Sequence, residues 1–366
     1  MRLCSTLQSS RGALHRVGPG RESAFRDKAG RVRQSIGRFG RSPEGRVAMT
    51  DPLLKIEGLC KDFPGGGLLG AARRVVDCVD MAVATGQTWG IVGESGSGKT
   101  TLARCMLRLI QPSSGSVYFD GLNLAVLSAS GLREKRREFQ MVFQDPYASL
   151  NPGMTVEDII LEPLEVHKSG TREEQQRRLR ELIAAVSLDE SLLKRKPPEL
   201  SGGQQQRAGI ARGLALNPRL LIADEPVSAL DVSVQAQILN LLSDLKRRYE
   251  LTLVLISHSL YAIHYLCTHV SVMYRGRIVE EAPSDAFFSG PLHPYSAALL
   301  ESMPALDAAG GVIPLRRHDA GDRLGAGPGC AFRQSCGRRF GRCAKETPPL
   351  TEVAPGRKAA CFLYFR

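Results

Sequence analysis

Short apolar runs alternate with longer amphipathic stretches along most of this chain, from residue 53 to about residue 285. Apolar runs of four or five residues are typical of strands that are buried on both faces of a sheet. They predict strands at Thr88–Val92, Leu220–Ala223, Leu253–Ile256 and Val270–Met273. The amphipathic stretches predict helices, for example at Arg172–Val186 and Val234–Tyr249. This alternation is typical of an α/β fold.

The two ends of the chain lack this alternation. Residues 1–48 are rich in Arg, Gly and Ser and have no sustained periodicity, so we expect a disordered basic arm, a transit-like peptide or an upstream extension of the gene. Met49 looks like a natural start, because Leu53–Ile56 soon begins a strand pattern. Residues 306–329 are rich in Gly, Ala and Pro and predict a linker. We expect three parts: the extension 1–48, a folded domain over 49–290, and a linker with a cysteine-rich domain over 291–366.

The positive charge is concentrated in the first of these parts. The formal net charge is +12, of which residues 1–48 contribute +8 and the remaining residues only +4. A strongly basic surface is typical of nucleic-acid or anionic-membrane binding, but here the positive charge is mostly a property of the extension, so we expect no specific nucleic-acid partner.

The longest unbroken apolar run is seven residues, Ala359–Phe365. A membrane-spanning helix needs about 20, so we expect none.

A glycine-rich loop follows the first buried strand and precedes a helical pattern at Thr101–Ile110. It fits the spacing G-x-x-x-x-G-K-[ST] in the context that a phosphate-binding loop requires. The glycines let backbone N–H groups cradle phosphate oxygens, the lysine neutralises the β- and γ-phosphates, and the hydroxyl of the last residue ligates Mg²⁺. The predicted nucleotide-binding residues are Gly93, Glu94, Ser95, Gly96, Ser97, Gly98, Lys99, Thr100 and Thr101.

A second motif ends the apolar strand at Leu220–Ala223 with two adjacent acids, Asp224 and Glu225. A buried strand does not end in two carboxylates without a compensating role, because burying charge is costly. Asp224 suits a role at Mg²⁺ through a water molecule, and Glu225 is placed to polarise the attacking water as a general base. Together with the phosphate loop, the pair predicts nucleoside triphosphate hydrolysis.

A third motif, Leu200-Ser201-Gly202-Gly203-Gln204, lies shortly before these acids. Ser201 and the amides of the two glycines stand before a helical pattern at Gln204–Leu216, so the positive end of that helix can meet a phosphate. Ser201, Gly202, Gly203 and Gln204 are therefore predicted to bind nucleotide.

This third motif resembles the signature of ABC-type ATPases, and the resemblance extends over nearly all of residues 53–366. Within that class the chain is similar to the ATP-binding subunits of oligopeptide and dipeptide importers, the peptide/nickel family. The stretches that carry the closer resemblance are Val142–Pro152, Asp224–Val232 and Pro291-Leu292-His293-Pro294-Tyr295.

The resemblance implies roles for further residues. Two such subunits, identical or different, would pair head to tail, with each ATP between the phosphate loop of one and the signature of the other. Gln144 matches the glutamine that contacts Mg²⁺ and senses the membrane subunit, and His258 matches the histidine that contacts the γ-phosphate. Asp231 matches an aspartate at the dimer interface, and Phe63 lies where an aromatic ring stacks on adenine. The family commonly has Asp after this histidine; here it is Ser259.

The resemblance also implies an architecture and a function. The fold would be the P-loop NTPase ABC cassette, with a RecA-like core over 53–143 and 207–285 and a helical signature subdomain over 144–206. The chain would hydrolyse ATP with Mg²⁺ to power the import of di- or oligopeptides through two separate transmembrane permease subunits, which an extracytoplasmic solute-binding protein would supply. It would lie peripherally at the cytoplasmic face of the inner or plasma membrane.

Three other functions fit parts of the sequence. Nickel or another small solute is one alternative cargo, although nickel-type relatives usually lack a cysteine tail. A soluble ABC protein acting on nucleic acid or ribosomes is another. DNA-repair members of that kind have a long coiled-coil insertion between the phosphate loop and the signature, whereas here only about 100 residues separate the two, with no heptad run. A module that binds ATP without hydrolysis is disfavoured by the intact Lys99, Asp224, Glu225 and His258.

Four of the nine cysteines, Cys330, Cys336, Cys343 and Cys361, crowd the end of the chain. The odd total, with no secretory signal, argues against a disulfide framework. Structural zinc sites usually contain C-x2-4-C pairs, and this tail has none. Four thiolates also suit an iron–sulfur cluster. Because similar tails in peptide-importer ATPases resemble 4Fe-4S binders, the resemblance favours a 4Fe-4S cluster, with zinc or free redox thiols as alternatives.

Overall fold

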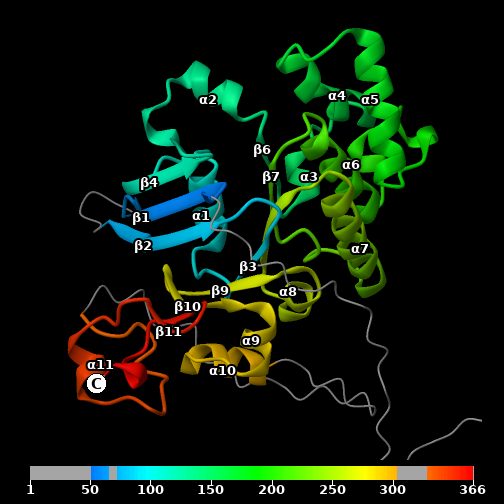
Figure 1. Cartoon of the computed structure of the whole chain (residues 1–366). Helices are drawn as coiled ribbons and strands as arrows, with labels where there is room; N and C mark the ends of the chain where they lie inside the picture. The colour runs from blue at the N-terminus through cyan, green and yellow to red at the C-terminus, as the bar shows by residue number, and fades with distance from the viewer. Residues whose placement is uncertain (1–50, 66–71, 303–327, 366) are drawn as a thin grey trace, which may run out of the picture. The chain divides into compact units, whose positions relative to one another are not determined.

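The computed structural model describes residues 51–65, 72–302 and 328–365. The expected extension 1–48 and most of the expected linker 306–329 lie outside the described residues. The residues from Met49 onward cluster into one unit, and the elements below all belong to it (Figure 1).

The larger sheet has eight strands in the order β11-β12-β10-β9-β3-β8-β7-β6. Its centre is parallel from β9 to β6, and β10 pairs antiparallel with both β9 and β12. The four strands predicted from apolar runs are confirmed as β3, β7, β8 and β9, and three of them are buried along their whole length. The bounds are β3 Thr88–Val92, β6 Phe139–Val142, β7 Leu220–Asp224, β8 Thr252–Ser257, β9 His269–Tyr274, β10 Arg277–Pro283, β11 Thr351–Ala354 and β12 Arg357–Ala359.

A smaller antiparallel sheet has the order β2-β1-β4-β5. Its strands are β1 Leu54–Phe63, β2 Arg73–Val83, β4 Ser114–Phe119 and β5 Leu122–Asn123. Helix α1, Lys99–Met106, places Leu102 and Met106 in one apolar cluster with side chains of both sheets. The helix predicted at Thr101–Ile110 ends earlier than expected, at Met106. The reason is local: Arg108 adopts a left-handed φ of 49°, which no helical residue can have.

The remaining helices include a group that carries the signature (Figure 1, green). Three of its helices begin with a side chain that accepts a hydrogen bond from the backbone three residues on, at Thr155, Thr171 and Ser201. The helices are α2 Ala129–Lys135, α3 Pro146–Ser149, α4 Val156–Val166, α5 Arg172–Ala185, α6 Gly202–Leu214, α7 Val232–Arg248, α8 Leu260–Leu266, α9 Ser284–Ser289, α10 Pro294–Glu301 and α11 Gly341–Lys345. Short 3₁₀ turns lie at Leu124–Val126, Glu190–Leu192, Pro197–Glu199 and Phe362–Tyr364.

The boundary expected at residue 206, between helical subdomain and core, falls inside α6. This helix packs against α3 and α4 on one side and against β6 of the larger sheet on the other. The signature and the sheet are therefore joined by one continuous helix.

The described part of the region beyond α9 packs on this core. The hairpin β11–β12 extends the larger sheet through β10. Phe332, with 6% of its surface exposed, lies edge-on to Tyr274, 5.5 Å between ring centroids, and also contacts the ring of Tyr295. The C-terminal cysteines are thus attached to the larger sheet through an aromatic cluster.

Replacing Phe332 by alanine tests this attachment. We expect Phe332→Ala to lower the free energy of unfolding by about 3 kcal/mol, because a buried aromatic ring leaves a cavity. The change is measured by urea unfolding followed through the fluorescence of Trp89, the single tryptophan, which lies in β3. Phe340→Ala, at a ring that is 44% exposed, is the control and should change stability by less than about 0.5 kcal/mol. An unchanged Trp89 transition in Phe332→Ala would show that the C-terminal region unfolds separately from the core.

Candidate functional site

The glycine-rich loop joins the end of β3 to the start of α1 and wraps a buried lysine. Lys99 is only 4% exposed, and its ammonium donates to the carbonyl oxygens of Gly93 and Glu94, each at 2.8 Å. Burial lowers the pKa of Lys99, and the nearby Glu225 and Asp224 oppose this shift. Gly98 has a φ of 105°, and a Cβ there would lie 2.5 Å from the carbonyl oxygen of Val75. The loop therefore requires glycine at this position and presents a buried cation for an anionic ligand.

Thr100 and Asp224 meet at the carboxyl ends of β3 and β7. The Thr100 hydroxyl donates to Asp224 Oδ1 at 3.1 Å. Asp224 is 1% exposed, and its burial raises the pKa of its carboxyl, while the bond from Thr100 opposes the shift. A hydroxyl and a carboxylate oxygen are hard donors of the kind that Mg²⁺ accepts. Thr100 and Asp224 therefore fit a magnesium ion that accompanies bound phosphates.

Glu225 is the point where two other segments converge. Gln144, after β6, donates to Glu225 Oε2 at 3.2 Å, and His258, after β8, lies with Nδ1 3.1 Å from the same oxygen. Glu225 has a left-handed φ of 45°, and its N–H donates to the carbonyl oxygen of Ile256 at 2.8 Å. A strained backbone held by a neighbouring strand aims this carboxylate away from the buried strand end.

These residues share one hollow with a volume of about 560 Å³. This size is ordinary for a small-molecule site. Its lining comprises Arg73, Val75, Ser95, Gly96, Gly98, Lys99, Thr100, Thr101, Gln144, Glu225 and His258. The sequence reasoning missed Arg73 and Val75. They come from β2, and no motif marks them.

Other predicted site residues lie outside this hollow. Ser201 is exposed and accepts from Gln204 N–H at the start of α6, while Asp231 stands before α7. Phe63 pairs in register with Arg73, at the rim of the hollow, and the ammonium of Lys61 lies 5.0 Å from its ring. The signature residues and Asp231 therefore do not meet the phosphate loop within one chain.

Ser259, which stands where the family commonly has aspartate, caps a helix. Its hydroxyl accepts a hydrogen bond from Ala262 N–H at 3.4 Å, and its own N–H donates to the Ser257 hydroxyl at 3.0 Å. This capping fixes the start of α8 directly after His258. The imidazole is thus oriented by its backbone and by Glu225.

The phosphate loop has a further support that the sequence reasoning missed. The phenol oxygen of Tyr295 accepts a hydrogen bond from Glu94 N–H at 3.0 Å. Tyr295 is 2% exposed, and its own N–H donates to His293 Nδ1 at 3.0 Å. Burial lowers the pKa of His293 to about 4, so the ring is neutral and can accept this bond. The N–H groups of Leu292 and His293 donate to the buried Glu280 carboxylate, each at 2.8 Å.

The four tail cysteines line a second hollow together with His293, Phe332, Arg333, Arg338 and Phe362. Burial raises the pKa of Cys330 and of Cys361. Among the described residues, the cysteine group whose ligand atoms all lie within 4.8 Å of one another is found elsewhere, at Cys60, Asp77 and Cys78. The four tail cysteines line one hollow, whereas Cys60, Asp77 and Cys78 bring their ligand atoms closer to one another.

Comparison with known proteins agrees with this geometry. A family profile described as "ABC transporter" matches residues 76–228, and one described as "Oligopeptide/dipeptide transporter, C-terminal region" matches residues 279–343. The chain is 44% identical over 328 residues to the oligopeptide transport ATP-binding protein AppF of Bacillus subtilis, covering 87% of this chain and 99% of that protein. It is 45% identical over 315 residues to a Brucella ovis protein described as a peptide import ATP-binding protein, covering 86% and 98%.

Solved structures show the same fold. The dimeric ATP-binding cassette MJ0796, in a post-hydrolysis state with ADP and Pi, superposes with a TM-score of 0.58 at 30% identity, over 63% of this chain and 98% of that one. A cassette of the cbiONQ transporter from Clostridium perfringens gives the same TM-score at 26% identity, over 66% and 92%. The phosphate loop, the paired acids and the C-terminal match together lead to one conclusion: this chain belongs to the ABC transporter ATP-binding proteins, in the group with an oligopeptide/dipeptide transporter C-terminal region.

Proposed function

We propose that this chain binds and hydrolyses ATP to power the import of di- or oligopeptides through separate membrane permease subunits. The observation that carries the proposal is the hollow in which Lys99, Thr100, Gln144, Glu225 and His258 converge, in a chain whose C-terminal region matches that of peptide transporters. The relatives named above are peptide-transport proteins, which favours a peptide cargo over nickel and over a role on nucleic acid. In the described part of the chain, no helix is long and apolar enough to cross a membrane.

The chemistry assigned to the hollow follows from its charges. Lys99 would neutralise the β- and γ-phosphates of bound ATP, and Thr100 and Asp224 would hold the magnesium ion that accompanies them. Magnesium, when bound, supplies charge neutralisation at the transferring phosphoryl group. Glu225 accepts a proton from the attacking water. Gln144 and His258 orient the Glu225 carboxylate through their contacts with its Oε2 atom. The incoming triphosphate also compensates the buried charge of Lys99.

A second copy or a similar subunit completes the site in this proposal. Ser201, Gly202, Gly203, Gln204 and Asp231 lie outside the hollow of their own chain. The exposed Ser201 stands at the positive N-terminal end of α6, where an anion is favoured. The likeness to dimeric cassettes supports a head-to-tail pair with ATP between the phosphate loop and the partner signature.

A larger hollow, about 750 Å³, supports contact with membrane subunits. It lies beside Gln144 and is lined by side chains of β6, α3, α4 and α6 and of the segment after α1. Leu109 and Val166 on its rim are 42% and 48% exposed, while Arg136, Glu162 and Arg212 supply charge. Exposed apolar side chains around a concave surface suit an inserted partner helix. We assign this hollow to a permease segment, with the chain at the cytoplasmic face of the membrane and a solute-binding protein on the other side.

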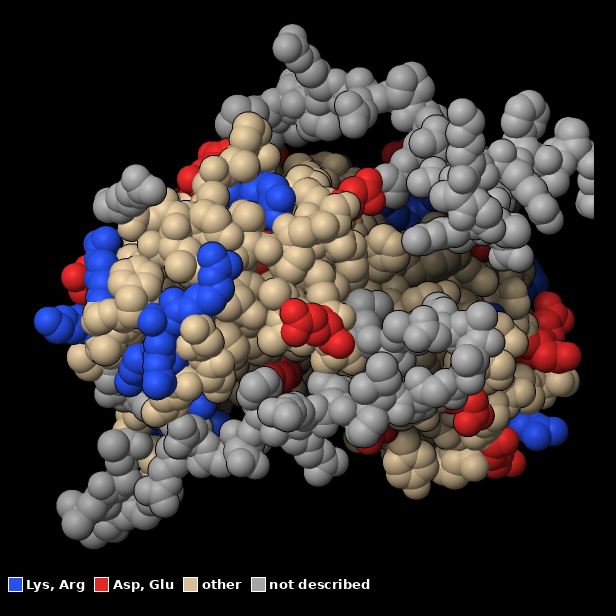
Figure 2. Space-filling model, turned by 90° about the horizontal axis from the view of Figure 1, so that it is seen from below, with Lys and Arg blue, Asp and Glu red and all other residues tan. Residues whose placement is uncertain are grey.

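The tail hollow is proposed to hold an iron–sulfur cluster. Four cysteine thiols line this hollow, and four thiolates are the ligand set of a 4Fe-4S cluster. Figure 2 shows Lys and Arg gathered over one end of the molecule, where the C-terminal region lies, and Arg333 and Arg338 line the hollow itself. Positive neighbours stabilise thiolates and the negative charge of such a cluster. Cys330, Cys336, Cys343 and Cys361 would be its ligands.

The general-base role is tested by Glu225→Gln. The amide keeps the shape that Gln144 and His258 contact but cannot accept the proton, so we expect turnover to fall by at least about 100-fold. ATP binding should persist, and gel filtration with ATP should show a stable dimer. Glu301→Gln, at an exposed acid in α10, should behave as the unchanged chain. Turnover of Glu225→Gln at the unchanged rate would contradict the general-base assignment.

The support from Tyr295 is tested by Tyr295→Phe, which removes only the hydroxyl. The Glu94 N–H then loses its acceptor, which costs about 1 kcal/mol or more, so we expect the KM for ATP to rise about fivefold with a smaller change in kcat. Steady-state ATPase measurements give both constants. Tyr261→Phe, at an exposed ring on α8, is the matched control. Equal KM values for the two variants would show that the phosphate loop does not depend on this bond.

The cluster is tested by anaerobic purification. We expect iron and acid-labile sulfide in the protein together with a broad visible absorption band, because iron–sulfur charge transfer absorbs there. Cys330→Ser should lose most of the iron, while Cys105→Ser, at a buried cysteine in α1, should retain it. A colourless, iron-free preparation in which Cys330→Ser is as stable as the unchanged chain would overturn the assignment.

A further inference from the structure

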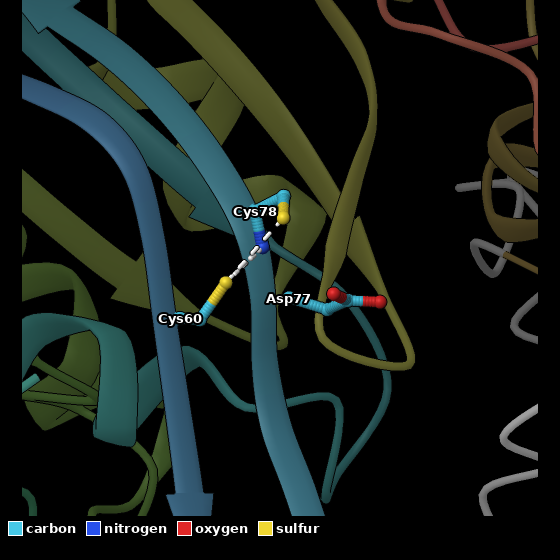
Figure 3. A group of neighbouring side chains, drawn as sticks. All are labelled: Cys60, Asp77 and Cys78. Carbon is cyan, nitrogen blue, oxygen red and sulfur yellow. Dashed lines mark hydrogen bonds between the residues drawn. The ribbon is translucent and has the colours of Figure 1, made fainter. Parts of the chain in front are cut away.

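Two cysteines outside the tail lie side by side on the smaller sheet. Cys60 is on β1 and Cys78 on β2, and their sulfur atoms are 3.4 Å apart. The N–H of Cys78 also donates to the sulfur of Cys60 at 3.1 Å. Figure 3 shows these contacts between the two neighbouring strands. Cys60 is buried whereas Cys78 is exposed, so a small reagent can reach the pair from one side.

An irregularity in strand pairing brings the two sulfurs together. Leu59 pairs with Val79 and Lys61 with Val76, so Cys60 alone faces both Asp77 and Cys78. This is a β-bulge, which re-aims side chains of the strand that carries the extra residue. Cys78 adopts a left-handed φ of 49°, which is unusual for a residue with a side chain. The bulge therefore holds Cys78 against Cys60 at a cost in backbone strain.

The surroundings favour a sulfur–sulfur bond over a metal ion. Asp77 lies within 4.8 Å of both sulfurs and could complete a metal site, but both of its carboxylate oxygens are already bound by arginines. Arg74 donates to Oδ1 at 3.2 Å, and Arg277 donates to Oδ2 at 2.7 Å. In Figure 3 the carboxylate lies on the other side of the β2 ribbon from Cys60. Two guanidinium groups at the third ligand repel a cation.

We propose that Cys60 and Cys78 are a modification site at which a reversible disulfide forms between the two residues and weakens ATP binding. The oxidant is a low-molecular-weight disulfide such as oxidised glutathione. The Cys78 thiolate attacks one glutathione sulfur, forming a mixed disulfide and releasing one glutathione thiolate. The Cys60 thiol then loses its proton and attacks the Cys78 sulfur, which releases the second glutathione. The two protein thiols lose two electrons and two protons in total, and one oxidised glutathione becomes two reduced molecules.

The geometry suits this bond. The bulge puts the two cysteines on adjacent antiparallel strands with their sulfur atoms in contact, as a disulfide between neighbouring strands requires. The sulfurs must approach by about 1.4 Å to reach the bond length of about 2.05 Å. The hydrogen bond with Cys60 and burial raise the pKa of Cys78 to about 11. The Cys78 thiol is therefore protonated at neutral pH, and its attack on a disulfide accelerates as the pH rises.

The bulge is connected to the phosphate loop by two hydrogen bonds. Asp77 N–H donates to the carbonyl oxygen of Gly276 at 2.9 Å, and Gly276 N–H donates to the carbonyl oxygen of Ser97 at 2.8 Å. Val75, in the same strand, lines the nucleotide hollow, and its carbonyl oxygen would be 2.5 Å from a Cβ on Gly98. A shift of Cys78 toward Cys60 therefore moves groups that position the loop. The effect on ATP binding rests on the proposed ATP site, whereas formation of the Cys60–Cys78 disulfide does not.

The test uses the full chain with oxidised glutathione at about pH 8.5, where more of the thiol is ionised. Free thiols are then blocked, and tryptic peptides are examined by mass spectrometry. Cleavage after Lys55, Lys61, Arg74 and Lys99 puts Cys60 in residues 56–61 and Cys78 in residues 75–99. We expect these two peptides to be joined, with the loss of two hydrogens, and separated by dithiothreitol. Cys78→Ser, at the exposed position, and Cys60→Ser should give no such product.

The second measurement is ATP binding by titration calorimetry. We expect oxidation to raise the Kd for ATP about fivefold, reversed by dithiothreitol and absent in Cys78→Ser. The proposal is overturned if no joined peptide forms while other thiols of the chain oxidise, if the pair instead retains one zinc ion and resists oxidation, or if the joined form binds ATP unchanged. A reduced chain that does not bind ATP would count against the proposed function, and the joined peptide would still report on the disulfide.

Discussion

A buried ammonium at the carboxyl edge of a parallel sheet constrains the rest of this structure. Lys99 is held by two main-chain carbonyl groups, next to the equally buried Asp224. Charges in such a place are costly unless they are paired, so the surrounding backbone must supply partners until phosphates arrive. Because β3, β8 and β7 are parallel neighbours, their carboxyl ends lie at one edge of the sheet, beside this loop. The loop also needs the left-handed glycine at 98, since a side chain there would meet the Val75 carbonyl oxygen.

The same constraint links the C-terminal region to nucleotide chemistry. Glu280 binds the backbone of Leu292 and His293, His293 caps the start of α10, and Tyr295 reaches Glu94 in the phosphate loop. Phe332 packs on Tyr295 and lines the cysteine hollow. The C-terminal region thus contacts the glycine-rich loop of the proposed ATP site. Because protein interiors are close-packed, these aromatic contacts join the cysteine hollow and the glycine-rich loop into one packed unit.

Several features were predictable because they depend on local sequence. A strand buried on both faces must be apolar throughout, so β3, β7, β8 and β9 appear as apolar runs. The phosphate loop depends on glycines at set spacings, and the α6 start depends on Ser201 and Gln204, which cap each other. The end of α1 was not predictable, because the sequence Leu107–Ile110 still suits a helix. Arg108 instead adopts a left-handed φ of 49° directly after α1, and the helix ends there.

The sequence by itself predicted the chemistry of this protein: a phosphate-binding loop, a pair of acids at the end of β7, and a resemblance to ABC-type ATPases. Only the tertiary structure decided which of these side chains meet. It joined Gln144, Glu225 and His258 from three strand ends, left Ser201 and Asp231 outside their own hollow, and brought Tyr295 to Glu94. It also placed Cys60 beside Cys78 through a bulge. The physical reason is that motifs record local backbone requirements, whereas contacts between distant segments depend on strand order and register, which no single segment encodes.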